Sequence, residues 1–69
     1  MVKSLRFKEA RIKAGLTQVE AAEQLGIAQP TISAWERGVN EPRASLLGAI
    51  AKLYKTSVVY LLELDGDDS

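Results

Sequence analysis

The sequence contains no cysteine and no histidine among its 69 residues. The chain can therefore form no disulfide and no thiolate metal site, and a metal would have to bind carboxylates alone, for which no spacing is suited. The sequence also lacks a glycine-rich phosphate loop, and its C-terminal acids lie where no general acid–base pair could be held in place. These absences argue against an enzyme and predict neither a metal nor a cofactor.

Long apolar runs are absent as well. The longest hydrophobic segments are far too short to span a bilayer, and the N-terminal residues MVKSLRFKEAR lack the apolar centre of a signal peptide. A chain of this size forms one small domain, which buries only about 60% of its unfolded surface. We therefore expect a soluble, cytoplasmic domain over residues 1–64, without membrane contact, followed by an acidic flexible tail over residues 65–69.

The chain has no excess of charge of one sign. Nine basic and nine acidic residues give a net charge of zero, which is unusual for a nucleic-acid-binding domain. The charges are nevertheless separated along the chain. All nine Lys and Arg lie in residues 1–55 with five Glu, whereas residues 56–69 hold four acids and no base. The basic body is compatible with a partner that carries phosphates.

Apolar residues recur at helical spacing in five segments, which predicts an all-α chain. Thr17 and Glu20 form a T-x-x-E capping box, which starts the second helix. Gly15, Gly26 and Gly38 are placed to end the first three helices in a left-handed conformation. The expected helices, with Ser4 and Ser57 as the first and last N-caps, cover residues 4–14, 17–26, 28–38, 43–54 and 58–64.

The segment from Gly15 to Gly38 holds two short helices joined by a tight turn, which is a helix-turn-helix. Such a pair either contacts DNA or only fills a small domain. Ile32 and Trp35 are three residues apart and are expected to face inward together. Ala28 is an unusual N-cap, because it has no side-chain acceptor. Its use in place of Ser or Thr should cost about 1 kcal/mol.

The opposite face of the second of these helices carries small neutral side chains where a solvated face usually carries Glu and Lys. Glutamine can form paired hydrogen bonds with an adenine edge, and proline or alanine can contact a thymine methyl group. This composition suits close approach to a DNA groove. The expected outer face comprises Gln29, Pro30, Ser33, Ala34 and Arg37.

Two other features have both an ordinary and a functional interpretation. The five cations of the first helical segment, from Lys3 to Lys13, form either a solvated face, which is the favoured interpretation, or a phosphate-binding surface. Gln18 lies at a helix start, where free backbone N–H groups favour anions. It is otherwise an ordinary polar surface residue.

Three strings of residues carry a family resemblance: GLTQ, then AAEQLGI, then QPTISAWERG. With Pro42, the pattern of the fourth helix and SVVYLLEL, they resemble the helix-turn-helix domain of the phage lambda-type repressor and Cro family, also called the xenobiotic-response-element family. The resemblance covers about residues 5–64. It implies a five-helix, lambda-repressor-like domain that binds double-stranded operator DNA as a two-fold dimer.

The resemblance also implies roles for individual residues. Gln18 would contact a phosphate and support the recognition helix, and Arg11 and Glu36 would form a partly buried ion pair, interpreted as mainly structural. Base contacts are implied for Gln29, Pro30, Thr31, Ser33 and Ala34. Phosphate contacts are implied for Thr17, Gln18, Arg37, Asn40 and Arg43.

The chain departs from the family pattern at several positions. Ala10 and Ala21 stand where leucine is usual, which predicts a thinner core and modest stability. Ala28 replaces the usual Ser or Thr. Lys55 stands where Gly or Asn commonly ends the fourth helix, so it must adopt a left-handed backbone or form a different turn. Gly48, inside the same helix, either lets another backbone pack closely or is simply tolerated.

These observations predict a sequence-specific transcriptional regulator that acts on a near-palindromic operator as a repressor. A prophage repressor or Cro, a restriction-modification controller and an antitoxin are all compatible identities. The alternative is a protein-interaction module, such as an antitoxin that acts mainly through a protein partner. In the last helix, Val58, Leu61 and Leu62 are expected to face the core, which leaves Val59, Tyr60 and Leu64 as surplus apolar residues. This surplus suggests a homodimer, with ordinary surface hydrophobicity or a wrongly assigned core face as the alternative. The expected dimer residues are Leu46, Val59, Tyr60 and Leu64.

Overall fold

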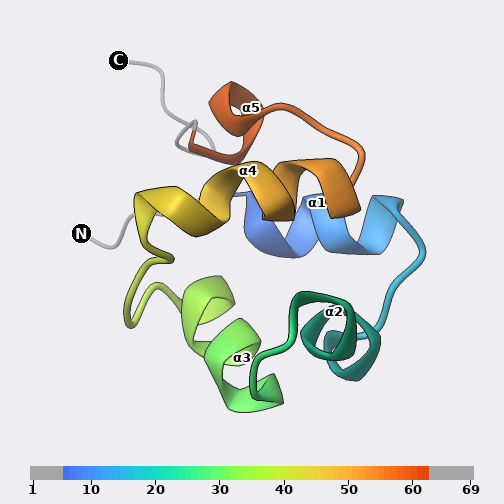
Figure 1. Cartoon of the computed structure of the whole chain (residues 1–69), viewed down its shortest axis with the longest axis vertical. Coiled ribbons are helices and arrows are strands. Elements are labelled where there is room, and N and C mark those ends of the chain that lie inside the picture. Colours follow the sequence, from blue (N-terminus) through green and yellow to red (C-terminus); the bar gives the residue numbers. More distant parts are fainter. Residues whose placement is uncertain (1–5, 63–69) are drawn as a thin grey trace.

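The computed structural model describes residues 6–62, and this part of the chain contains five helices and no strand. In Figure 1, α2 and α3 lie at one end of the molecule and α5 at the other, with α1 and α4 between them. None of these helices is long and apolar enough to cross a membrane. The predicted all-α, five-helix fold is confirmed. The helices are α1 (Phe7–Lys13), α2 (Gln18–Leu25), α3 (Gln29–Arg37), α4 (Ala44–Leu53) and α5 (Val58–Leu62).

Most helix ends form from the local signals that the sequence contains. The Thr17 hydroxyl accepts from the Glu20 N–H at 3.0 Å and the Glu20 carboxylate accepts from the Thr17 N–H at 2.9 Å, so the capping box is present. The Ser57 hydroxyl accepts from the Tyr60 N–H at 3.0 Å. Ala28 occupies the N-cap of α3 and makes no side-chain cap bond. These caps confirm three predicted helix starts.

Left-handed residues end the helices, as the glycine pattern predicts. Gly15, Gly26 and Gly38 have φ values of 79°, 72° and 76°. Lys55, after α4, has a φ of 58°. The chain therefore keeps a left-handed turn there without glycine, although this conformation costs a residue with a Cβ about 1–2 kcal/mol.

The start of α1 differs from the prediction. The helix begins at Phe7 with Arg6 in the N-cap position, where no side chain caps it. Ser4, the expected cap, lies outside the described residues, as do Leu64 and the predicted tail 65–69. The Arg6 N–H donates to the Leu61 carbonyl at 3.2 Å. A tertiary contact with α5 thus holds this end of α1.

The core draws on every helix and fixes the position of α3. Ile32 is fully buried and Trp35 is 5% exposed, as predicted. The ring of Phe7 from α1 packs against the Trp35 indole in a tilted arrangement, with a centroid distance of 6.0 Å. The small residues Ala10 and Ala21 are also buried, so the alanines that replace leucine do lie in the core.

Two expectations for α5 are wrong. Leu62 was expected to face the core, but it is 43% exposed. Tyr60 was expected to be surplus at the surface, but it is partly buried against the core. The Arg6 guanidinium lies 4.9 Å and the Lys13 ammonium 5.7 Å from the centroid of its ring. These cation–π contacts give the Tyr60 ring partners inside the same protein molecule.

Candidate nucleic-acid interface

Helix α3 presents a polar outer face opposite its buried residues. Pro30 and Arg37 are exposed, and Gln29, Thr31 and Ser33 are partly exposed. The Arg37 Nε–H donates to the Ser33 hydroxyl at 3.2 Å, which holds the guanidinium along the helix surface. Except for one residue, the expected outer face is accessible.

The exception is Ala34. It was expected on the outer face, but it is only 9% exposed. An alanine side chain is a single methyl group, which does not reach beyond the longer side chains around it. The prediction of its exposure is therefore wrong, and its expected contact with a base would have to be made through very little surface.

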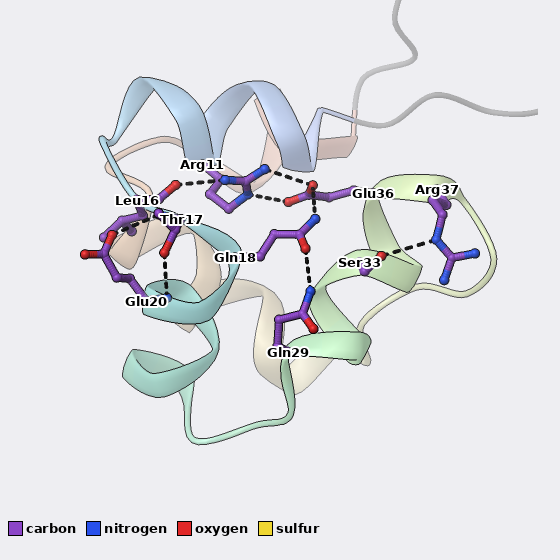
Figure 2. Close-up of polar contacts among 9 residues, drawn as sticks. All are labelled: Arg11, Leu16, Thr17, Gln18, Glu20, Gln29, Ser33, Glu36 and Arg37. Atoms are coloured by element: carbon purple, nitrogen blue, oxygen red, sulfur yellow. Dashed lines mark hydrogen bonds and ion pairs between the residues drawn. The ribbon is translucent and has the colours of Figure 1, made fainter.

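A continuous chain of hydrogen bonds joins α1, α2 and α3 behind this face (Figure 2). The Arg11 guanidinium donates to both oxygens of Glu36, from Nε at 2.6 Å and from Nη2 at 3.1 Å. The Gln18 Nε2 donates to Glu36 Oε1 at 3.0 Å. The Gln29 Nε2 then donates to Gln18 Oε1 at 2.5 Å. The expected ion pair between Arg11 and Glu36 is confirmed.

The direction of this chain follows from the chemistry of its inner end. A guanidinium can only donate and an ionised carboxylate can only accept. Gln18 must therefore present its NH2 group to Glu36, which leaves its oxygen facing Gln29. Gln29 in turn must donate its own NH2 group to that oxygen. Figure 2 shows the remaining Gln29 oxygen pointing away from Gln18.

The ion pair between Arg11 and Glu36, from which the hydrogen-bond chain begins, is well shielded from water. The side chains of Arg11 and Glu36 are 10% and 5% exposed. Arg11 Nη1 also donates to the Leu16 carbonyl at 2.8 Å. The hydrogen bond to Glu36 raises the pKa of Arg11 above its usual value, despite an opposing effect of burial. Removing one partner would leave the other charge buried and uncompensated, which is strongly destabilising.

Four of the five expected phosphate-contacting residues fall into two local groups, and the fifth, Arg37, lies on the outer face of α3 described above. Thr17 and Gln18 lie at the start of α2. Within residues 6–62, the hydroxyl proton of Thr17 and the second N–H of Gln18 make no hydrogen bond, so each residue has a donor to offer. Asn40 and Arg43 are exposed and line a groove of about 540 Å³ together with Thr31. The other residues that line this groove include Ile27, Trp35, Pro42 and Leu46.

The expected dimer residues are not equivalent. Val59 on α5 is 69% exposed. Leu46 is partly buried in the groove beside α3, and Tyr60 packs against α1, so both already have intramolecular contacts. Leu64 lies outside the described part of the chain. Leu62, which sequence reasoning assigned to the core, is exposed one turn from Val59.

Sequence reasoning missed the hydrogen-bond chain as a whole. Its links join residues 11, 18 and 25 positions apart. No local periodicity signals contacts at these separations, and only the ion pair and the supporting role of Gln18 were implied by the family resemblance. The buried Tyr54 hydroxyl, which has no hydrogen-bond partner in residues 6–62, was missed as well.

Comparisons with known proteins agree with this geometry. A family model described as Helix-turn-helix matches residues 7–61. The transcriptional regulator ImmR of Bacillus subtilis strain 168 is 47% identical over 60 residues, a stretch that covers 87% of this chain and 47% of ImmR. An uncharacterised HTH-type regulator of Archaeoglobus fulgidus is 32% identical over 63 residues, covering 91% of this chain and 90% of that protein.

The regulator YqaE of Bacillus subtilis is 34% identical to this chain, and the match covers 56% of its length. This chain therefore spans about half the length of the two Bacillus relatives.

Two solved structures share the arrangement of helices. The P22 c2 repressor, solved with a synthetic operator, aligns with a TM-score of 0.77 at 31% identity, covering 97% of this chain and 98% of that one. The N-terminal DNA-binding domain of SinR from Bacillus subtilis aligns with a TM-score of 0.76 at 28% identity, covering 90% of this chain and 91% of that one. The predicted lambda-repressor-like fold is confirmed.

Proposed function

This chain belongs to the helix-turn-helix family, in its lambda-repressor-like form, and from that membership we propose that it is a sequence-specific DNA-binding regulator of transcription. The observation that carries the proposal is the outer face of α3, where a hydrogen bond to Gln18 holds the Gln29 amide with its oxygen turned outward. An α-helix fits the major groove, and an oriented amide can recognise a base edge there.

Base contacts are assigned to the exposed start of α3. Gln29 supplies one acceptor and one free donor, which match the adenine N6–H2 and N7 groups. Pro30 is exposed and suits apolar contact with a thymine methyl group. Ser33 and Thr31 are partly exposed and offer hydroxyls. Ala34 has the smallest share in this assignment because it is buried.

Phosphate contacts are assigned to residues on either side of α3. Arg37 is exposed in the last turn of α3, and Asn40 and Arg43 are exposed in the segment that follows it. Thr17 and Gln18 would contribute from the start of α2, where backbone N–H groups also favour an anion. Such contacts position the protein without reading sequence, and they make binding depend on salt.

We assign the α5 surface to a homodimer, because Val59 and Leu62 expose apolar side chains one helical turn apart. Two-fold symmetry would place two copies of α3 about 34–36 Å apart on a near-palindromic site. A dimer bound over a promoter would act as a repressor by excluding other proteins.

Selection of bound sequences from random duplex DNA tests the proposal. The expected result is an enriched, near-palindromic site with half-sites about one helical turn apart, and an affinity that falls as salt rises. No enrichment, combined with a stable complex with another protein, would instead support the protein-interaction module.

A further inference from the structure

We propose that Glu36, acting through Gln18, sets the orientation of the Gln29 amide and so makes Gln29 select adenine over guanine. Neither Glu36 nor Gln18 needs to touch a base in this role, so both are positioning residues. The Glu36 side chain is 5% exposed, which keeps its carboxylate away from a bound base. The inference rests on the proposed function of Gln29 as a base-contacting residue.

The first step is the fixed direction of the hydrogen-bond chain. Glu36 accepts two hydrogen bonds from the Arg11 guanidinium, which can only donate. The carboxylate offers only acceptors, so the Gln18 amide cannot turn its oxygen towards it without placing two acceptors together. Gln18 therefore offers its oxygen to Gln29, and the Gln29 NH2 group is drawn inward.

The second step concerns which hydrogen-bonding groups of the Gln29 amide remain available to a base. One N–H is committed to Gln18, which leaves the carbonyl oxygen and one N–H. Adenine presents a donor and an acceptor in the major groove and pairs with both groups. Guanine presents two acceptors, N7 and O6, one of which would face the Gln29 oxygen. The geometry therefore favours adenine and disfavours guanine.

The third step is the consequence of removing the carboxylate. An amide in place of the Glu36 carboxylate can either accept or donate, so the series of hydrogen bonds through Gln18 and Gln29 can run in either direction. When it is reversed, the Gln29 oxygen faces inward and both of its N–H donors are free for the two guanine acceptors. If both directions are equally populated, adenine binding falls about twofold, because only half of the molecules are competent. Guanine binding rises at the same time.

The experiment compares the 69-residue chain and its variants on two operators. The operators differ only in having adenine or guanine at the base position that Gln29 contacts, and this position is first identified with Gln29→Ala. For the parent protein we expect adenine to be preferred about 5- to 150-fold, which is the range for a paired amide contact. Glu36→Gln should reduce this ratio about fivefold or more. Glu23→Gln removes a charge from an exposed residue of α2 and should leave the ratio unchanged.

Two further variants separate positioning from stability. Arg11→Lys keeps the cation but loses the paired donors, so it should lower the melting temperature and leave the adenine preference intact. Gln18→Met keeps the ion pair and removes the acceptor for Gln29, so it should reduce the preference even if Glu36→Gln does not fold. Helical circular dichroism identifies the temperature at which each variant is folded, and binding is measured there.

The outcomes are distinct. If folded Glu36→Gln and Gln18→Met keep the parent ratio, or if the base lost on Gln29→Ala is not adenine, the inference is overturned and the proposed function stands. If Arg11→Lys reduces the ratio as much as Glu36→Gln, the effect is one of stability and the inference is overturned as well. If the parent chain shows no preferred DNA sequence, the proposed function itself fails.

Discussion

At the scale of single residues, Tyr54 combines deep burial with a polar group that has no partner. The residue is 2% exposed, and its hydroxyl has no hydrogen-bond partner within residues 6–62. Burial raises the pKa of Tyr54 to about 12; the negative charge of Glu36 adds to this shift and the positive charge of Arg11 opposes it. The unfolded chain releases the same proton near pH 10.

This difference predicts how stability depends on pH. The stability linked to Tyr54 is fully present below about pH 10 and is lost as the pH rises towards 12, because the unfolded state releases a proton that the folded state retains. Tyr54→Phe should remove this loss. At pH 7 it should change the free energy of unfolding by less than about 1 kcal/mol, because no hydrogen bond is broken. Urea unfolding of both proteins at pH 7 and from pH 9 to 11.5 measures both effects. A loss above about 2 kcal/mol at pH 7 would show that the hydroxyl has a partner.

Arg37 tests the division between base and phosphate contacts. Its guanidinium is exposed and held beside Ser33, so it is suited to a phosphate. We expect Arg37→Ala to weaken binding to all sequences about equally and to reduce the salt slope by about 1. Arg37→Lys, which keeps the charge, should retain most of the slope. Titrations at several salt concentrations measure this, and a selective loss at one base position would contradict the assignment.

At the scale of elements, α4 contains a glycine that nothing in the fold requires. Gly48 is exposed, and a Cβ built there meets no atom within 4 Å. The sequence left two explanations for this glycine, and the structure supports simple tolerance. Gly48→Ala should stabilise the protein by about 0.5–1 kcal/mol, because alanine restricts the unfolded chain and favours helix.

Gly26→Ala is the matched control for this prediction. The substitution is chemically identical and the space is equally open, but the φ of Gly26 is 72°. Alanine is strained there, so this variant should be destabilised by about 1 kcal/mol or more. Thermal unfolding of the two variants should give shifts of opposite sign. A lower melting temperature for Gly48→Ala would contradict the account of α4.

The elements also indicate which parts of the fold can be predicted from sequence. Caps such as Thr17 with Glu20 are contained in a few adjacent residues, and the spacing of Ile32 and Trp35 gave the inner face of α3. The start of α1 depends instead on a bond from Arg6 to Leu61, which are far apart in sequence. Helix α5 has only five residues and is apolar all round, so its periodicity could not assign Leu62.

The candidate site, too, could be predicted from the sequence only in part. The family resemblance implied which residues of α3 contact DNA, and the pattern of small neutral residues agreed with it. Ala34 was misplaced because helical spacing gives the direction of a side chain but not the cover that its neighbours provide. The links from Gln18 to Glu36 and Gln29 join three helices, so they appear only once tertiary packing is known.

At the scale of the whole molecule, the exposed apolar residues of α5 predict association. Val59→Asp and Leu62→Asp should convert a dimer into a monomer of 7.5 kDa, because a charge would have to be buried in the interface. Val19→Asp is the control, since Val19 on α2 is 55% exposed outside this surface. Sedimentation velocity without DNA distinguishes the species. If Val59→Asp leaves the oligomeric state of the parent unchanged, the α5 dimer is wrong.

The central claim is that Gln29, held by its hydrogen-bond chain, contacts an adenine edge, and a thermodynamic cycle tests it most directly. The affinities of the parent and Gln29→Ala are measured on the selected operator and on one with 7-deazaadenine at the contacted position, which lacks the N7 acceptor. The modified base should lower the affinity of the parent for the operator about fivefold or more, because its glutamine donates to N7. It should lower the affinity of Gln29→Ala less than twofold, because alanine makes no such contact. Equal losses for both proteins would show that Gln29 does not contact that base.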